Sequence, residues 1–115
     1  MSYIINFSGH PIAGFEISPL IGVNLPLDNA EGLTQAIGAV LDALPMRDEL
    51  KAGAAVEVVL PGMSTACGVF LASWHGRFGS FPKIRWAVRG DNGFEWPEAT
   101  RADLQAIRLQ ARTAR

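Results

Sequence analysis

The sequence predicts an α/β fold: a single domain over residues 1–115 with a mainly parallel sheet and a C-terminal β-hairpin plus helix. Three observations support this prediction. The chain has 115 residues and 49% apolar content, which is enough for one core and too little for two. Short apolar runs alternate with helical patterns, as in parallel sheets. Residues 58–84 read as strand, glycine turn and buried helix in direct succession.

Three strands are expected in the first half of the chain. Residues 3–7 form an apolar run that ends in a Ser-Gly-His-Pro turn, which predicts a buried strand. A short strand is expected around residues 20–25, where prolines bound the run on both sides. Residues 54–60 are rich in β-branched side chains and predict a third strand, after a charged connector at residues 46–53.

Two helices are expected beside these strands. Asp28 or Asn29 caps the first, with Glu31 three residues after Asp28 in the manner of a capping box, and Pro45 ends it. The apolar residues of this helix recur at helical spacing on one face. The second helix covers residues 64–75 and is apolar throughout, which predicts a buried position.

The last third of the chain changes pattern. Apolar and polar residues alternate over residues 84–89, and a Gly-Asp-Asn-Gly turn leads into residues 94–96, which predicts a β-hairpin. A final helix is expected from Thr100, with Asp103 three residues later. Its narrow apolar stripe consists of Leu104, Ile107 and Ala111. Beside it lies a stripe of arginines, made of Arg101, Arg108, Arg112 and Arg115.

Charge is distributed unevenly along the chain. Seven acidic and two basic residues up to Gly76 give a net −5, whereas eight basic and four acidic residues from Arg77 onward give +4. The basic half hints at an anionic partner, and the alternative is a solvated face in a domain whose two halves neutralise each other.

Other classes are disfavoured. The chain shows neither a signal-peptide pattern nor a run of about 18 apolar residues, so we expect a cytoplasmic protein without a membrane partner. The single cysteine, Cys67, lies in the apolar helix and is expected to be a buried, inert thiol. Two histidines and one cysteine, widely separated, offer no metal-ligand spacing, so neither a metal nor a cofactor is expected.

Two glycine turns form the predicted binding site. Ser8, Gly9 and His10 follow the first strand, and Pro61, Gly62, Met63 and Ser64 follow the strand at residues 54–60. Open α/β sheets bind ligands at the carboxyl ends of their parallel strands, so the two turns should lie side by side there. Glycine lets backbone N–H groups approach an anion closely, and the helix that starts at Ser64 adds the positive end of its dipole.

The sequence His75-Gly76-Arg77 interrupts the apolar helix with polar groups. One interpretation makes Gly76 the C-cap of the helix, with His75 and Arg77 as last-turn residues that interact favourably with the helix dipole. The other makes these three residues part of the ligand site, where Arg77 would donate to a phosphate or a base edge. Phe78 or Phe81 would then supply an aromatic face, and Phe81 is equally explained as a core or loop anchor.

The chain resembles a known family in three segments, LPGMSTACGVFLASWHGRFGSFPKI, the opening IINFSGHP and the ending LQAIRLQAR. These resemble the Csx-fifteen family, small CRISPR-associated accessory proteins of type III systems. The resemblance implies a compact Rossmann-like, CARF-like domain and a homodimer or higher homo-oligomer. It also implies a ligand of the cyclic oligoadenylate class, first of all cyclic tetra-adenylate, and no long nucleic acid. The chain departs from the family by lacking room for a full helix after the first strand and by having Ser73-Trp74 before the His-Gly-Arg.

Three function classes follow. The first is a non-enzymatic binder that sequesters the cyclic oligoadenylate, with no catalytic residue and with the ring shared across a two-fold axis. The second is a metal-independent ring nuclease, in which a ribose 2′-OH attacks its own phosphodiester and His10 or His75 transfers a proton. The third is a protein-interaction module that uses the C-terminal arginine stripe.

Overall fold

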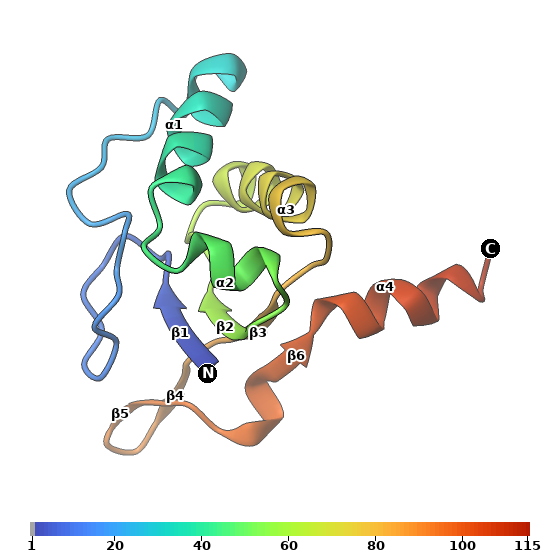
Figure 1. Ribbon diagram of the computed structural model, residues 1–115. Helices are drawn as coiled ribbons and strands as arrows, with labels where there is room; N and C mark the ends of the chain where they lie inside the picture. The colour runs from blue at the N-terminus through green and yellow to red at the C-terminus, as the bar shows by residue number, and fades with distance from the viewer. Residues whose placement is uncertain (1) are drawn as a thin grey trace.

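A computed structural model describes residues 2–115 of the chain (Figure 1). The chain forms four α-helices, one short 3₁₀ helix and six strands among these residues. In chain order they are β1 (Ser2–Asn6), α1 (Ala30–Asp42), α2 (Arg47–Lys51), β2 (Ala55–Val59), α3 (Ser64–Phe78), β3 (Lys83–Arg85), β4 (Val88–Gly90), β5 (Gly93–Glu95), η1 (Glu98–Thr100), β6 (Arg101–Asp103) and α4 (Leu104–Arg112).

The main sheet has the strand order β1-β2-β3-β6. β1 pairs with β2 and β2 with β3 in parallel, while β6 joins the edge of β3 antiparallel. Its register aligns Ile5, Val58, Ile84 and Ala102 across the four strands. The predicted α/β class with a mainly parallel sheet is thereby confirmed, and the predicted hairpin is the separate two-stranded sheet β4-β5.

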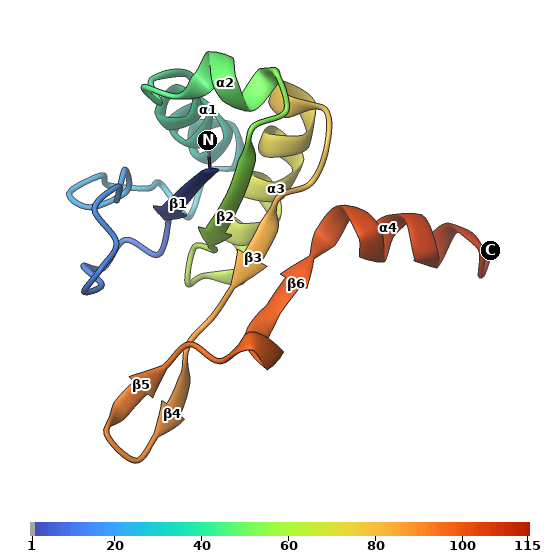
Figure 2. The ribbon, with the colours of Figure 1, turned by 60° about the horizontal axis from the view of Figure 1, so that its bottom comes forward.

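One face of the sheet holds the core. α1 and α3 pack against each other on that face, and the chain order places both right-handed β-α-β connections there (Figure 2). Phe7, Phe70 and Trp74 form an aromatic cluster, with the Phe7 and Phe70 ring centroids 4.6 Å apart and at most 2% exposure of each residue. The opposite face carries the mixed row Ile4, Glu57, Lys83 and Asp103, in which Ile4 is 40% exposed.

The two long helices begin and end on identifiable caps. Asn29, and not Asp28, caps α1: its side chain accepts a hydrogen bond from the Gly32 N–H at 3.0 Å. α3 continues to Phe78, and its C-cap is Gly79 at φ 81°. The reading of Gly76 as the C-cap is therefore wrong. Phe78 packs on Trp74 with ring centroids 4.6 Å apart, a contact that favours the additional helical turn.

Two further expectations for the first half of the chain are wrong. No strand forms at residues 20–25: residues 20–22 belong to a turn and residues 23–25 are irregular. The N–H groups of Ile21 and Val23 bond locally, and Gly22 has φ 79°. β1 instead meets the chain at Ile17, which forms an isolated bridge with Ile5. Residues 46–53 are more than a connector, since they contain α2, which buries Leu50 in the core.

The C-terminal third also differs from the expected continuous strand and helix. β3 and β4 are separated at Trp86, whose N–H donates to the Thr100 carbonyl and whose carbonyl accepts from the Thr100 hydroxyl at 2.7 Å. Thr100 therefore ties η1 to the end of β3 and does not start the final helix. That helix, α4, is capped by the Asp103 carboxylate and extends away from the body of the molecule (Figures 1 and 2).

Candidate functional site

The two glycine turns meet at the carboxyl ends of β1 and β2. Because these strands are neighbours and parallel, the chain leaves both at the same edge of the sheet. A hollow of about 190 Å³ lies between the turns, and we call it the glycine hollow. Its lining includes Ser8, Gly9 and His10 from the first turn and Pro61, Gly62 and Met63 from the second. Phe7, Ala66 and four residues of the loop at 20–25 also line it.

A buried asparagine shapes the first turn. Asn6 is fully buried at the end of β1, and its side-chain oxygen accepts a hydrogen bond from the Ser8 N–H at 2.9 Å. Its side-chain amide donates to the His10 carbonyl at 2.6 Å and to the Ser18 hydroxyl at 3.2 Å. Gly9 completes the turn at φ 83°. Sequence reasoning missed Asn6, although a polar residue in the run Ile-Ile-Asn-Phe was the signal for it.

α3 opens directly at the second turn. Its N-cap, Met63, is extended and provides no side-chain hydrogen bond to the first turn of the helix. The first intrahelical bond runs from the Cys67 N–H to the Met63 carbonyl. The N–H groups that precede Cys67 in the helix therefore have no intrahelical acceptor, and they carry the positive end of the dipole of a 15-residue helix.

A second, larger hollow adjoins the first one. It has a volume of about 510 Å³ and shares Ser8 and His10 with the glycine hollow. Its other lining residues are Pro11, Ile12, Ala13, Val59, Trp86, Ala87, Phe94 and Trp96, and we call it the aromatic hollow. The two hollows are therefore neighbours at the carboxyl edge of the sheet, and Ser8 and His10 line both of them.

The hairpin supplies the aromatic rings. Phe94 is 70% exposed and Trp86 is 44% exposed, while Trp96 packs on Phe15 with ring centroids 5.0 Å apart. The Arg89 guanidinium lies over the Phe94 ring, 5.9 Å from its centroid. Sequence reasoning missed these rings, because the alternation of residues 84–89 placed Trp86 on the buried face of one continuous strand. The signal was the density of aromatic residues on both strands of a short hairpin.

Titratable groups are scarce at this edge. His10 is the one titratable side chain among the described residues that line the two hollows. The surface therefore combines glycine turns, aromatic rings and aliphatic side chains, with Arg89 beside Phe94. Such a surface is suited to a planar, hydrogen-bonding ligand with phosphate groups.

The residues His75, Gly76 and Arg77 are not brought to these hollows. They lie in the last turns of α3, and at 1.5 Å per residue Arg77 is about 20 Å along the helix from Ser64. The Arg77 guanidinium donates two hydrogen bonds to Asp42 on α1, at 2.8 and 3.2 Å. This pairing holds the pKa of Asp42 below its usual value and raises that of Arg77. Arg77 thus bridges α1 and α3.

Gly38 makes room for the Arg77–Asp42 pair. A Cβ atom at this buried position of α1 would lie 2.6 Å from an Arg77 guanidinium nitrogen. The absence of a side chain lets the guanidinium approach α1 closely. The predicted contact of Arg77 with a ligand at the glycine turns is therefore replaced by a contact between two helices.

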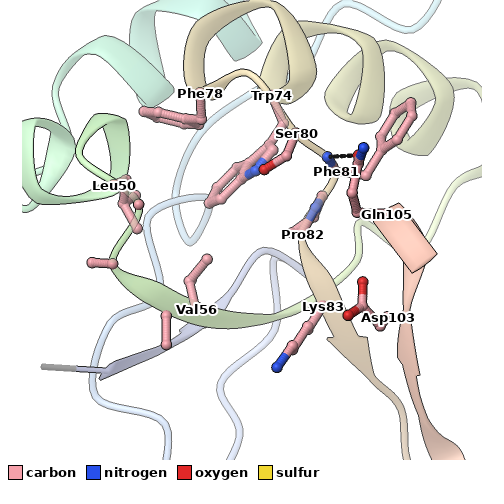
Figure 3. A pocket seen from close by; sticks show the side chains of 13 residues that line it. Leu50, Val56, Trp74, Phe78, Ser80, Phe81, Pro82, Lys83, Asp103 and Gln105 are labelled. Carbon is pink, nitrogen blue, oxygen red and sulfur yellow. Dashed lines mark hydrogen bonds between the residues drawn. The ribbon is translucent and has the colours of Figure 1, made fainter. Parts of the chain in front are cut away.

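The predicted aromatic faces, Phe78 and Phe81, line a different cavity. This cavity has a volume of about 230 Å³ and lies beside the N-terminal ends of β2 and β3, near Trp74 and Leu50 (Figure 3). The Phe81 N–H donates to the Gln105 side-chain oxygen at 2.9 Å, and the Phe81 ring packs on His75 with centroids 4.6 Å apart. The Phe81 ring and backbone thus connect α3 to the start of α4, as expected for a structural anchor.

Other chemistry finds little support in the part of the chain that is described. Residues 2–115 contain no cluster of three or more potential metal ligands. Burial raises the pKa of the Cys67 thiol, which disfavours the reactive thiolate. None of the helices described is both long and apolar enough to cross a bilayer.

Comparisons of the chain with protein-family models, with curated proteins and with solved structures find no match. Functional assignment therefore depends on the residues and geometry of the site.

Proposed function

We propose that this protein binds a cyclic oligoadenylate, first of all cyclic tetra-adenylate, and sequesters it within a Rossmann-like, CARF-like domain. The observation that carries the proposal is that the glycine hollow and the aromatic hollow lie next to each other at the carboxyl edge of the sheet and share Ser8 and His10. A cyclic oligoadenylate combines phosphates with adenines, and the two hollows offer complementary chemistry to both.

The phosphates would lie in the glycine hollow. Gly9 and Gly62 leave the backbone open, since a Cβ atom added at either position meets no atom within 4 Å. Backbone N–H groups at the start of α3 are available as donors, and hydrogen bonds to an anionic phosphate are about twice as strong as neutral ones. Asn6 holds the first turn in place before any ligand arrives, which lowers the entropic cost of binding.

The adenines would stack in the aromatic hollow. Trp86 and Phe94 expose large parts of their rings, and base stacking on an aromatic side chain contributes about 1–3 kcal/mol per base. Arg89, positioned over Phe94, adds a cation beside the stacked base.

Sequestration explains the site better than cleavage does. Ring cleavage by a 2′-OH needs in-line positioning and groups that accept and donate protons. His10 stands where the two hollows join, which is the observation that favours the ring nuclease as the second candidate. However, no second titratable side chain is among the described residues that line the hollows, so His10 lacks an acid-base partner there. We therefore assign binding to the site and no catalytic residue.

The test is Phe94→Ala, measured by calorimetry with cyclic tetra-adenylate. Phe94 is 70% exposed, so its removal leaves the core intact. Loss of one stacked base weakens binding by about 1–3 kcal/mol, which is roughly fivefold to 150-fold in Kd. Leu27→Ala is the matched control, since it removes a 46% exposed apolar side chain outside both hollows. Equal affinities for the two variants would contradict stacking at the hairpin.

A further inference from the structure

β6 leaves one edge of the main sheet open. It pairs only with β3, and the Thr100 carbonyl and the Leu104 N–H bond toward that strand. Because alternate residues of a strand bond to opposite sides, Arg101 and Asp103 direct their backbone groups outward. The Arg101 N–H is occupied by the Glu98 carbonyl, and the Asp103 carbonyl belongs to the first turn of α4. The Arg101 carbonyl and the Asp103 N–H remain available at the edge.

This free acceptor and free donor match each other across a two-fold axis. An antiparallel copy of β6 centred on Ala102 places Arg101 opposite Asp103 of the second copy, and Asp103 opposite Arg101. Each Asp103 N–H then reaches the Arg101 carbonyl of the other copy. The side chains in these positions carry opposite charges, and Arg101 makes no ion pair within the described residues. The small side chain of Ala102 lies on the axis and leaves the approach open.

α4 leaves an apolar stripe exposed next to this edge. None of its residues is buried, and Ile107, at the centre of its apolar stripe, is 52% exposed. The chain exposes 7196 Å², whereas a monomer of 12.4 kDa is expected to expose about 6100 Å². The radius of gyration, 14.5 Å, exceeds the value of about 13 Å expected for 115 residues. The excess area of about 1100 Å² is larger than the area of about 800 Å² that each partner buries in a standard interface, so the exposed surface is sufficient for a dimer.

We propose that a second copy of this chain pairs with the first along β6, through antiparallel Arg101–Asp103 contacts, and that the two α4 helices cover this interface. The apolar stripe of α4 is then buried between the copies. The interface forms without nucleotide, because all of its contacts come from the protein.

The pairing has a consequence for the candidate site, and this consequence rests on the proposed function. α4 starts at the N-terminal end of β3 and extends sideways past β6 (Figure 2). Since the partner's sheet runs in the opposite direction, α4 of one copy lies beside the carboxyl edge of the other. It carries Arg108 and Arg112 toward a site whose own lining has no arginine or lysine among the described residues.

Charge exchange tests the interface in sedimentation experiments on the full chain without nucleotide. We expect the wild-type protein to sediment at twice its mass of 12.4 kDa. Arg101→Asp places two carboxylates opposite each other, and Asp103→Arg places two guanidinium groups opposite each other, so each variant alone dimerises at least tenfold more weakly. Mixing the two variants restores both opposite-charge pairs and therefore restores the dimer. Arg47→Asp, the same side-chain change on the distant α2, leaves the dimer unchanged.

The mixing arm also controls for folding, because Asp103→Arg removes the cap of α4. Recovery of the dimer requires both variants to be folded. A wild-type monomer at all concentrations, or dimers of undiminished affinity in both variants, would overturn the interface. A mixture that stays monomeric overturns it as well when both variants match the wild type in circular dichroism. A dimer that binds no cyclic oligoadenylate supports the interface and refutes the proposed function, so the two failures are distinguishable.

Discussion

The Gly62→Ala variant is expected to weaken ligand binding at the candidate site without lowering the stability of the fold. Gly62 has no positive φ, and a Cβ added there meets no atom within 4 Å, so the free protein accommodates the methyl group. Alanine also restricts the unfolded chain, and we expect Gly62→Ala to leave stability unchanged or to raise it by about 0.4–1 kcal/mol. The same methyl group projects from a turn that lines the glycine hollow. The methyl group holds a phosphate away from the backbone donors. The resulting loss of about 1.5–3 kcal/mol of binding free energy corresponds to at least tenfold weaker binding.

Gly9→Ala and Gly53→Ala are the comparison variants for stability and for binding. Both glycines have positive φ, 83° and 95°, so alanine at either costs about 1–2 kcal/mol of stability. With about 2.1 cal/mol/K of unfolding entropy per residue, each kcal/mol lowers the Tm of 115 residues by about 4 °C. Gly9 lines the glycine hollow and Gly53 does not, so only Gly9→Ala also weakens binding. Differential scanning calorimetry and titration with cyclic tetra-adenylate supply the two readouts. Unchanged affinity in Gly62→Ala would refute the assignment of phosphate binding to this turn.

Two further predictions concern the ion pairs. Arg77→Ala lowers the Tm, because it breaks the ion pair with Asp42 that links α1 to α3. The affinity for cyclic tetra-adenylate stays unchanged. A loss of affinity without a change in Tm would instead indicate that Arg77 contacts the ligand. Arg85 holds the pKa of Glu57 below its usual 4.5 through hydrogen bonds of 2.8 and 3.0 Å. The stabilisation by this ion pair is fully present above the pKa of Glu57 in the unfolded chain. It is lost as the pH falls below that pKa and through the lowered pKa of the folded state. Glu57→Gln therefore costs about 1 kcal/mol at pH 7 and less at pH 3, as urea unfolding at both values measures; an equal cost at both would contradict the ion pair.

Elements defined by local signals were predictable from the sequence. The apolar runs of β1 and β2 and the start of α3 were recognisable, because burial and glycine turns leave a local pattern. The end of α3 was not, since Gly76 and Gly79 compete as caps and the outcome depends on Phe78 packing against Trp74. β6 was missed because a three-residue strand is defined by its partner, β3, and hardly by its own residues.

The geometry of the candidate site was predictable to the same extent. The meeting of the two glycine turns followed from parallel strand order alone. The aromatic hollow did not, because the position of Phe94 and Trp96 depends on how the hairpin leaves β3 at Trp86, a contact with Thr100 that is 14 residues away. Arg77 was assigned to the site because the His-Gly-Arg cluster interrupts an apolar helix, and this pattern does not show that the cluster lies at the end of a 15-residue helix far from the glycine turns.

The most direct test of the central claim is incubation of excess purified protein with cyclic tri-, tetra- and hexa-adenylate, followed by native and denaturing mass spectrometry. The account predicts that cyclic tetra-adenylate is retained by the protein, that its retention falls as salt rises, and that the ring is recovered intact after denaturation. Linear or 2′,3′-cyclic-phosphate products that disappear in His10→Ala would establish the ring nuclease in its place. Retention of none of the three rings would contradict cyclic oligoadenylate binding by this chain.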